Sequence, residues 1–295
     1  EPDVCCELAL QPINAFKLDA AILFSDILTI PDSFGLGVEF VEKEGPVFNN
    51  PINSSTDISN LDHFDPESLD YVYKAVKNIK NSLSEEIPLI GFCGSPWTLA
   101  AYSIEGRSSK DFEKTLNFLV SNQKDVHNLL TKYTDACFLY LRRQVQSGAD
   151  VIQIFDSWAN LLTKEGLIEY SFNYINALIS ALKLDPVTKN IPVIVFARNP
   201  KCNIEELINT SADCISLFWS MNDLNFELAK NKVAIQGNLD PKILLESDEI
   251  IKRETYKILE KFEKYPGYIF NLGHGITPDI NPDKIKYLTN IVREY

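Results

Sequence analysis

Short apolar runs recur along this chain, and a small group of polar residues follows each of them. Their length and their Val, Ile, Leu and Phe content are typical of buried strands. We predict strands over residues 20–25, 88–93, 151–155, 192–197, 214–219, 233–237 and 268–272. Helical patterns lie between most of these runs and predict helices over residues 5–16, 66–83, 109–146, 163–183, 203–210, 222–230, 247–264 and 282–293. This alternation indicates a mostly parallel α/β sheet with helices on both faces.

Two α/β architectures agree with this order of elements: an open doubly wound sheet and a closed (β/α)8 TIM barrel. The doubly wound sheet usually has a G-x-G-x-x-G turn after an early strand, and this sequence has none. A barrel agrees better, although it has eight strands and the sequence indicates seven. We therefore expect a single barrel domain over residues 1–295 that lacks its first strand and is N-terminally incomplete. Residues 31–63 form the longest irregular stretch and are expected to be an active-site loop on the upper face.

The composition narrows the possible partners. A net charge of −13 argues against nucleic acid, which is bound through clustered Lys and Arg. The same charge would repel a polyanionic ligand at long range, so a site for one would need local donors inside a cleft. No apolar stretch approaches the ~18 residues that a membrane span needs. The six cysteines include no C-x-x-C pair, so we expect them to be reduced thiols of a protein in an intracellular compartment.

Asp26 is the strongest candidate for a catalytic residue. In a parallel α/β fold the functional residues gather where strands end, and Asp26 comes at the end of the first predicted strand. It has no Lys or Arg beside it, and apolar residues follow it instead of a turn. Because burial of an unpaired carboxylate is costly, we favour a functional site over a structural cap.

His274 is the second candidate, because Gly273 and Gly275 on either side of it let the backbone approach a ligand closely. Tyr102, after the strand 88–93, is as compatible with a half-buried core position as with a site. Asp240, which precedes Pro241, is interpreted as a helix N-cap. The sequence has no H-E-x-x-H, His-x-Cys or C-x-x-C pattern for a metal and no G-x-S-x-G elbow for a catalytic triad.

Six stretches in one order along the chain resemble the uroporphyrinogen decarboxylase family. They begin at Cys6 (CELALQP), Leu18 (LDAAILFSDIL), Gly91 (GFCGSPWTL, with Tyr102 and Glu105-Gly106 after it), Gly148 (GADVIQIFDSWA), Gln236 (QGNLDP) and Asn271 (NLGHGI). Six ordered matches are more specific than any one motif, and they cover nearly the whole chain.

The resemblance implies a (β/α)8 barrel that forms a homodimer and uses no metal or organic cofactor. It implies the decarboxylation of the four acetate side chains of uroporphyrinogen III, which gives coproporphyrinogen III. In the family an aspartate hydrogen-bonds the pyrrole N–H groups and stabilises a protonated-pyrrole cation, and this role falls on Asp26. Substrate carboxylates would be bound by Tyr102, Ser157 and His274, and Phe155 would line the pocket.

The chain departs from the family at its N-terminus. The family's Arg-Gln-Ala-Gly-Arg stretch, whose two arginines bind carboxylates, is absent from this sequence, as is the strand that precedes it. Both absences are explained if the chain starts one βα unit late, and we expect the chain as written to be inactive. The sequence leaves open whether Arg107 or Arg198 compensates. Smaller departures are Phe218 before Trp219, where the family commonly has an acid, and Arg198-Asn199, where it often has Lys-Asp.

Two other functions remain open on the sequence. The first is a corrinoid-dependent methyltransferase of the same superfamily, which would bind zinc through His-x-Cys and a later Cys, whereas Gly275-Ile276 follows His274. The second is a non-catalytic tetrapyrrole-binding protein, for which the carboxylate of Asp26 has no evident use. The sequence is equally compatible with a cytoplasmic protein and with a plastid protein whose transit peptide has been removed.

Overall fold

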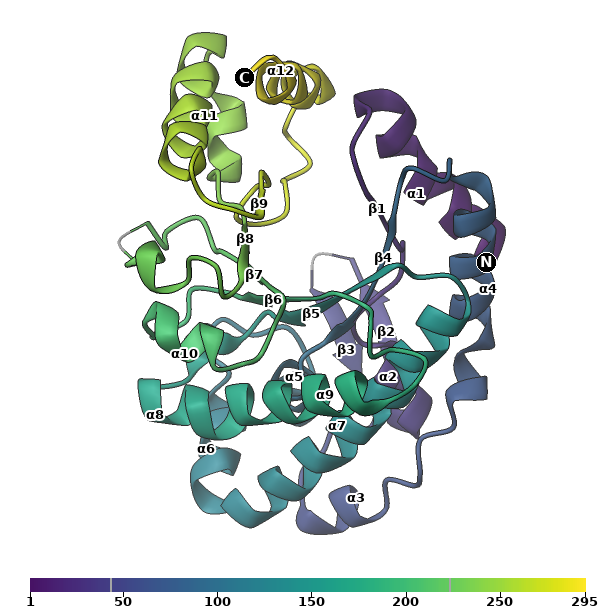
Figure 1. Ribbon diagram of the computed structural model, residues 1–295. Helices are drawn as coiled ribbons and strands as arrows, with labels where there is room; N and C mark the ends of the chain where they lie inside the picture. The colour runs from purple at the N-terminus through teal and green to yellow at the C-terminus, as the bar shows by residue number, and fades with distance from the viewer. Residues whose placement is uncertain (43, 223) are drawn as a thin grey trace.

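The centre of the computed structural model, which describes residues 1–42, 44–222 and 224–295, is a sheet of seven parallel strands. The sheet curls into a half-barrel (Figure 1). Its strands lie in the order β1 (Ala21–Ile22), β4 (Leu89–Gly94), β5 (Val151–Asp156), β6 (Val193–Ala197), β7 (Cys214–Ser216), β8 (Ala234–Gln236) and β9 (Tyr268–Ile269). All seven predicted strands are therefore confirmed in position, and their spatial order follows their order along the chain.

The alternation of side chains along β5 separates the two faces of the sheet. Gln153 and Phe155 line a cavity on the inner, concave face, whereas Ile152 and Ile154, which alternate with them, are fully buried on the outer face. In the parallel ladder Gly94 of β4 pairs with Phe155, and Phe155 pairs with Phe196 of β6. Residues of one row on neighbouring strands therefore stand side by side on the concave face.

The outer face is covered by helices, of which α7 is the longest at 24 residues and packs against α5, α9 and β4. Figure 1 shows α5, α7 and α9 along the same side of the sheet. The helical segments are α1 (Pro2–Phe16), α2 (Thr29–Pro31), η1 (Asp32–Leu36), α3 (Ser55–Ser59), η2 (Pro66–Leu69), α4 (Asp70–Ser82), α5 (Pro96–Glu105), α6 (Glu113–Ser121), α7 (Gln123–Gln146), η3 (Ala159–Leu161), α8 (Lys164–Gly166), η4 (Leu167–Phe172), α9 (Asn173–Leu184), α10 (Ile204–Ile208), η5 (Phe226–Leu228), η6 (Pro241–Leu245), α11 (Asp248–Phe262) and α12 (Pro282–Glu294).

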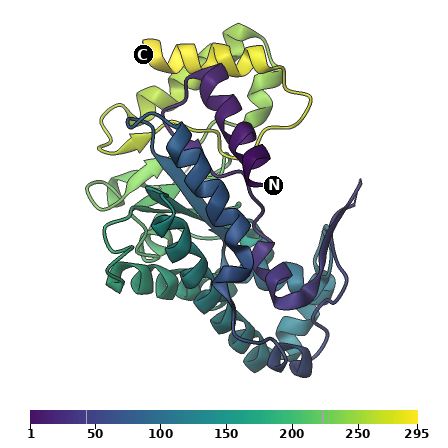
Figure 2. The same ribbon diagram turned by 90° about the vertical axis from the view of Figure 1, so that its right-hand side faces the viewer.

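The structure corrects three predictions about the connecting segments. The stretch 31–63 is not irregular, because it holds the antiparallel hairpin of β2 (Val38–Val41) and β3 (Gly45–Phe48), which projects from the body in Figure 2. The helix predicted over 109–146 is two helices, α6 and α7, with a break at Asn122. The helix predicted over 222–230 is wrong, since only the short 3-10 turn η5 forms there and residue 223 lies outside the described residues.

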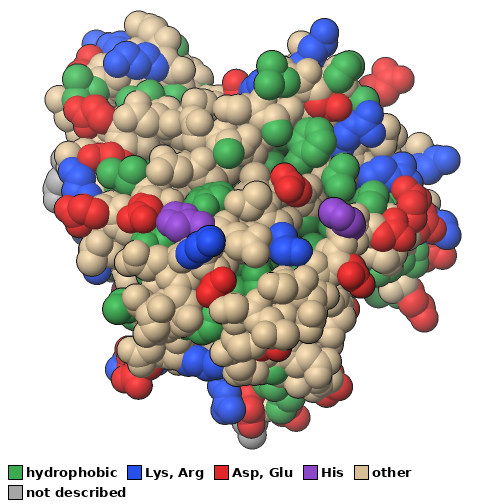
Figure 3. All heavy atoms as spheres, turned by 90° about the horizontal axis from the view of Figure 1, so that it is seen from below, with side chains coloured by type: hydrophobic (Ala, Val, Ile, Leu, Met, Phe, Trp, Pro, Cys, Tyr) green, Lys and Arg blue, Asp and Glu red, His purple; other side chains and the backbone are tan. Residues whose placement is uncertain are grey.

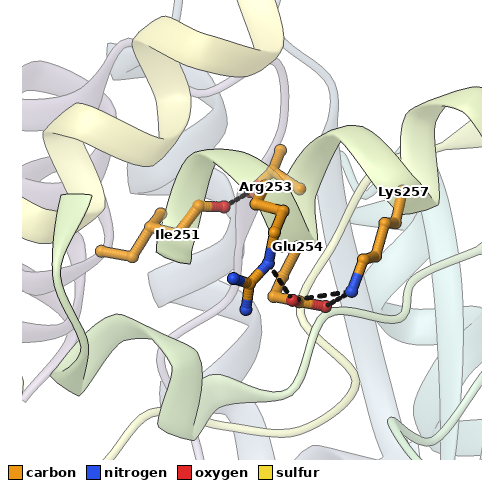
Figure 4. Close-up of polar contacts among 5 residues, drawn as sticks. Ile251, Arg253, Glu254 and Lys257 are labelled. Atoms are coloured by element: carbon orange, nitrogen blue, oxygen red, sulfur yellow. Dashed lines mark hydrogen bonds and ion pairs between the residues drawn. The ribbon is translucent and has the colours of Figure 1, made fainter. Parts of the chain in front are cut away.

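The helix ends follow local side-chain chemistry. Asp65 and Asn281 each accept a hydrogen bond from the backbone N–H two residues later, at 3.0 Å and 2.9 Å, and each precedes a proline at the first helical position. On α11 the Glu254 carboxylate accepts from both Arg253 and Lys257 at 2.8 Å (Figure 4). These contacts hold the exposed side of the helix and leave its apolar side for packing.

A second, smaller core lies beside the C-terminal strands. It consists of Leu239, Leu244, Ile251, Ile280, Leu288 and Ile291, so it joins η6, α11 and α12. The edge strands β1 and β9 pair with β4 and β8 and not with each other in the described part of the chain. The helical layer does connect across this edge, because Arg293 of α12 forms an ion pair with Asp19 at 2.9 Å.

The surface carries mixed charge. On the face that Figure 3 shows, acidic and basic side chains are interspersed and do not form a basic patch. Among the described residues, none of the helices combines the length and the apolar character that crossing a membrane would require.

Replacing Ile154 by Ala is expected to lower the free energy of unfolding by about 2–5 kcal/mol, because it leaves a cavity where a fully buried β5 side chain packs beneath the helices. The matched control is Val120→Ala, since Val120 is 77% exposed, and it should change stability by less than about 0.5 kcal/mol. Urea unfolding followed by circular dichroism measures both. Equal effects of the two substitutions would contradict the placement of β5.

Candidate functional site

The carboxyl ends of the strands surround a cavity of about 430 Å³ on the concave face. We call it the His274 cavity. Its lining combines apolar side chains with a few hydrogen-bonding ones and is contributed by strands that are far apart in the sequence. The residues are Ile22, Gln153, Phe155, Ser157, Phe196, Ser216, Asn271, Leu272, His274, Gly275 and Ile276. Three of the five predicted site residues, Phe155, Ser157 and His274, therefore line one cavity.

Aromatic rings form a continuous wall on the concave face. Successive ring centroids lie 5.3–6.3 Å apart, in the edge-to-face or tilted arrangements that aromatic rings prefer. The series runs Phe92, Phe155, Phe196, His274, Phe218 and Trp219. Such a wall offers a flat apolar ligand a large contact area, and His274 places a polar ring in the middle of it.

His274 is exposed in the loop that follows β9. A Cβ atom on Gly273 would lie 2.3 Å from the backbone nitrogen of Trp219, so only glycine permits the loop to pack this closely against the end of β7. Gly275 faces open space. Apart from a 3.4 Å contact of His274 Nδ1 with the Gly275 carbonyl, the structure records no hydrogen bond to the ring within the described residues. The imidazole can therefore donate to a ligand in the cavity.

Tyr102 is not among the residues that line the His274 cavity. It is partly buried on α5, and its ring packs edge-on against Trp158 and Phe112 at 5.6 Å and 5.8 Å. Trp158 directly follows Ser157, which lines the His274 cavity. The ring of Tyr102 thus contacts the ring of the residue that directly follows Ser157.

Asp26 lies in the loop after β1 and lines a second cavity of about 370 Å³, together with Phe24, Tyr71 and other residues. Its Oδ1 accepts a hydrogen bond from the backbone N–H of Leu28 at 2.7 Å. Burial raises the pKa of the Asp26 carboxyl, and this hydrogen bond acts in the opposite direction. Asp26 is not among the residues that line the His274 cavity. Ile22 lines the His274 cavity, and Phe24, two residues later, lines the cavity of Asp26. The two cavities are therefore neighbours at this segment.

Asp156, whose importance the sequence did not reveal, is fully buried at the end of β5. Its carboxylate accepts hydrogen bonds from Ser95 and Thr98, at 3.0 Å each, and from Ser171 of η4. Burial raises the pKa of Asp156, although the three hydroxyl donors favour its charged form. The carboxylate ties β5 to the start of α5 and to η4, so it fixes the elements that carry Ser157 and Tyr102.

The expected role of Asp240 is confirmed, because its side chain caps η6 by accepting from the backbone N–H of Lys242 at 3.0 Å. In the described ranges, no group of three or more His, Cys, Asp or Glu residues is arranged to hold a metal ion. The six cysteines are free thiols.

Comparison with known families gives one match over the whole length. The family described as uroporphyrinogen decarboxylase (URO-D) matches residues 1–295. A uroporphyrinogen decarboxylase of Ruthia magnifica is 44% identical over 297 residues, which covers 100% of this chain and 85% of that protein. A uroporphyrinogen decarboxylase of Legionella pneumophila (strain Corby) is 41% identical, and the matched region covers 99% of this chain and 83% of that protein.

Among solved structures, a methyltransferase from Methanosarcina mazei superposes with a TM-score of 0.82 and 18% sequence identity. The superposition covers 100% of this chain and 86% of that one. A B12-independent methionine synthase from Shewanella sp. W3-18-1 has a TM-score of 0.61 at 14% identity, over 99% and 87% of the chains. At this identity the likeness shows the shared α/β fold and confirms the predicted barrel class.

The raised pKa of Asp156 predicts how stability changes with pH. Because its folded-state pKa lies above the unfolded value, its contribution to stability is complete below the unfolded pKa and is lost as the pH rises through the folded pKa. The amide side chain of the Asp156→Asn variant does not ionise. The free energy of unfolding of the wild type minus that of the variant should therefore decrease as the pH rises above about 4. Urea unfolding over a pH series measures this difference, and a difference that increases with pH would refute the burial effect.

Proposed function

The chain belongs to the uroporphyrinogen decarboxylase family, and on this premise we propose that it is a carboxy-lyase of tetrapyrrole biosynthesis. It removes the carboxyl groups of the four acetate side chains of uroporphyrinogen III and gives coproporphyrinogen III. The full-length match to the family supports the reaction more directly than the fold does, because the fold is shared with a methyltransferase.

The observation that carries the proposal is the His274 cavity with its aromatic wall. A tetrapyrrole has an apolar macrocyclic body and charged carboxylates on its rim, so its site needs apolar contact area and hydrogen-bond donors. The rings of Phe155 and Phe196 supply contact area, while Ser157 and His274 supply donors at the same cavity. Tyr102, whose ring packs against that of Trp158, would add a further donor.

Decarboxylation of a pyrrole acetate requires an electron sink, because the bond that releases CO₂ leaves its electron pair on the methylene carbon. Protonation of the pyrrole ring creates this sink and places a positive charge on the ring. We assign the stabilisation of that charge to Asp26, whose partly buried carboxylate forms no ion pair within the described residues. A preplaced carboxylate in a site that excludes water stabilises a cation without rearrangement of solvent.

A homodimer and an intracellular location are further parts of the proposal. The projecting hairpin carries Phe40 and Val41, which are 65% and 40% exposed, and a second copy would bury this apolar surface. The free thiols are in keeping with a reducing compartment. The relatives reported above are bacterial, which favours the cytoplasm over a plastid.

Asp26→Asn is expected to lower kcat by about 10²–10³-fold, because it removes the charge that stabilises the cationic intermediate. Binding of the substrate should persist, since the amide keeps the shape of the side chain. The measurement is anaerobic turnover of uroporphyrinogen III by the full-length natural protein. Asp62→Asn, at an exposed loop position, is the matched control and should retain wild-type turnover. Full activity of the Asp26 variant would exclude the assigned role.

His274→Ala is expected to raise the Michaelis constant by about tenfold or more, since it removes a donor to a charged substrate group. Partial turnover at saturation should remain, because the group that stabilises the intermediate is still present. His63→Ala removes an exposed histidine of another loop and serves as the control. An unchanged Michaelis constant in the His274 variant would count against its role in binding.

A further inference from the structure

Arg198 continues the inner row of β6 beyond the end of the strand. Phe155 pairs with Phe196 and Asp156 with Ala197, and the ladder extends by a hydrogen bond of 2.9 Å from Arg198 N–H to the Asp156 carbonyl. In this register Arg198 stands opposite Ser157. Since Phe196 and Ser157 line the His274 cavity, strand alternation places Arg198 on the same concave face.

Arg198 differs from most arginines of the chain because its guanidinium forms no ion pair with a carboxylate in the described structure. Of the six arginines, four form ion pairs with a carboxylate, namely Arg142, Arg143, Arg253 and Arg293. Within the described residues, Arg198 has neither an ion pair nor a side-chain hydrogen bond, and its recorded partner is the ring of Trp158, 5.4 Å from Cζ to the centroid. Its hydrogen-bond donors therefore remain available to a ligand.

Trp158 is a rigid platform for this guanidinium. Its ring packs 4.2 Å from that of Phe112, and its carbonyl accepts a hydrogen bond of 3.0 Å from Trp97 Nε1–H. Its own Nε1 is shielded from solvent and lacks a hydrogen-bond partner in the described structure. A buried donor without a partner is rare in native proteins and indicates that a ligand or water supplies the acceptor.

We propose that Arg198, held against Trp158, binds a carboxylate of the tetrapyrrole substrate beside Ser157. The inference rests on the proposed function and assigns a cationic carboxylate site within it. A chain with a net charge of −13 repels a polycarboxylate at long range, so a local cation at the strand ends is needed to hold one. Arginine suits this role because its planar fork matches the two oxygens of a carboxylate.

Arg107, the other arginine without a recorded ion pair, lies elsewhere. It is exposed just after α5, where its backbone pairs with Val47 of the β2–β3 hairpin. It therefore offers a control that removes the same charge from an arginine with no recorded contact to Trp158 in the described structure.

The test compares Arg198→Met, Arg198→Lys and Arg107→Met in the full-length natural protein. The probe for binding is uroporphyrin III, the oxidised and stable form of the substrate, titrated by quenching of tryptophan fluorescence. Anaerobic assays with uroporphyrinogen III give KM and kcat. We expect Arg198→Met to raise Kd and KM by about 10- to 100-fold, with kcat changed much less. Arg198→Lys should recover part of the loss, and Arg107→Met should match the wild type.

Three results would overturn the inference: wild-type Kd and KM in Arg198→Met, a loss confined to kcat, or an equal loss in Arg107→Met. Unfolding midpoints of the variants show whether any loss reflects damage to the fold. Failure of the proposed function has a different signature, because the wild type itself would neither bind uroporphyrin III nor turn over the substrate.

Discussion

The arrangement of the site depends on one buried group, the Asp156 carboxylate, and on the three hydroxyl groups that donate to it. A carboxylate excluded from water is tolerable only while its donors stay in place, so β5, the start of α5 and η4 hold one relative arrangement. Phe155 and Ser157 flank Asp156 in the chain, and their side chains point to the opposite face of the sheet. The backbone carbonyl of Asp156 accepts a hydrogen bond from the backbone N–H of Arg198. Contacts on the outer face of the sheet thereby position the side chains of the concave face.

Much of the fold could be predicted from local patterns. The apolar runs were long enough to mark each strand, and parallel strands with helices between them can form only a few architectures. Helix caps such as Asp240 could be predicted because the capping side chain and the backbone N–H that it binds lie two residues apart in the sequence. Phe155 and Ser157 were predicted as site residues only from the family motif, and His274 also from the glycines beside it; parallel strands bring these residues to one edge.

The rest depends on contacts between residues far apart in the sequence. The spacing of Asp26 and His274 does not show that they line separate, neighbouring cavities, since that follows from how the chain leaves β1 after Ile22. The β2–β3 hairpin was missed because each of its strands has only four residues and β3 contains Gly45 and Pro46, which are typical of loops. The sequence did not single out Asp156, because its donors Ser95, Thr98 and Ser171 are supplied by other elements.

A decarboxylase for a polycarboxylate needs an apolar wall, donors for the carboxylates and one anion for the cationic intermediate. We propose that the aromatic wall, the donors at the strand ends and Asp26 are the corresponding features of this chain. The most direct test is anaerobic incubation of the full-length natural protein with uroporphyrinogen III and separation of the products by their number of carboxyl groups. The account predicts partly decarboxylated intermediates followed by coproporphyrinogen III. Unchanged substrate in the presence of folded protein would contradict it.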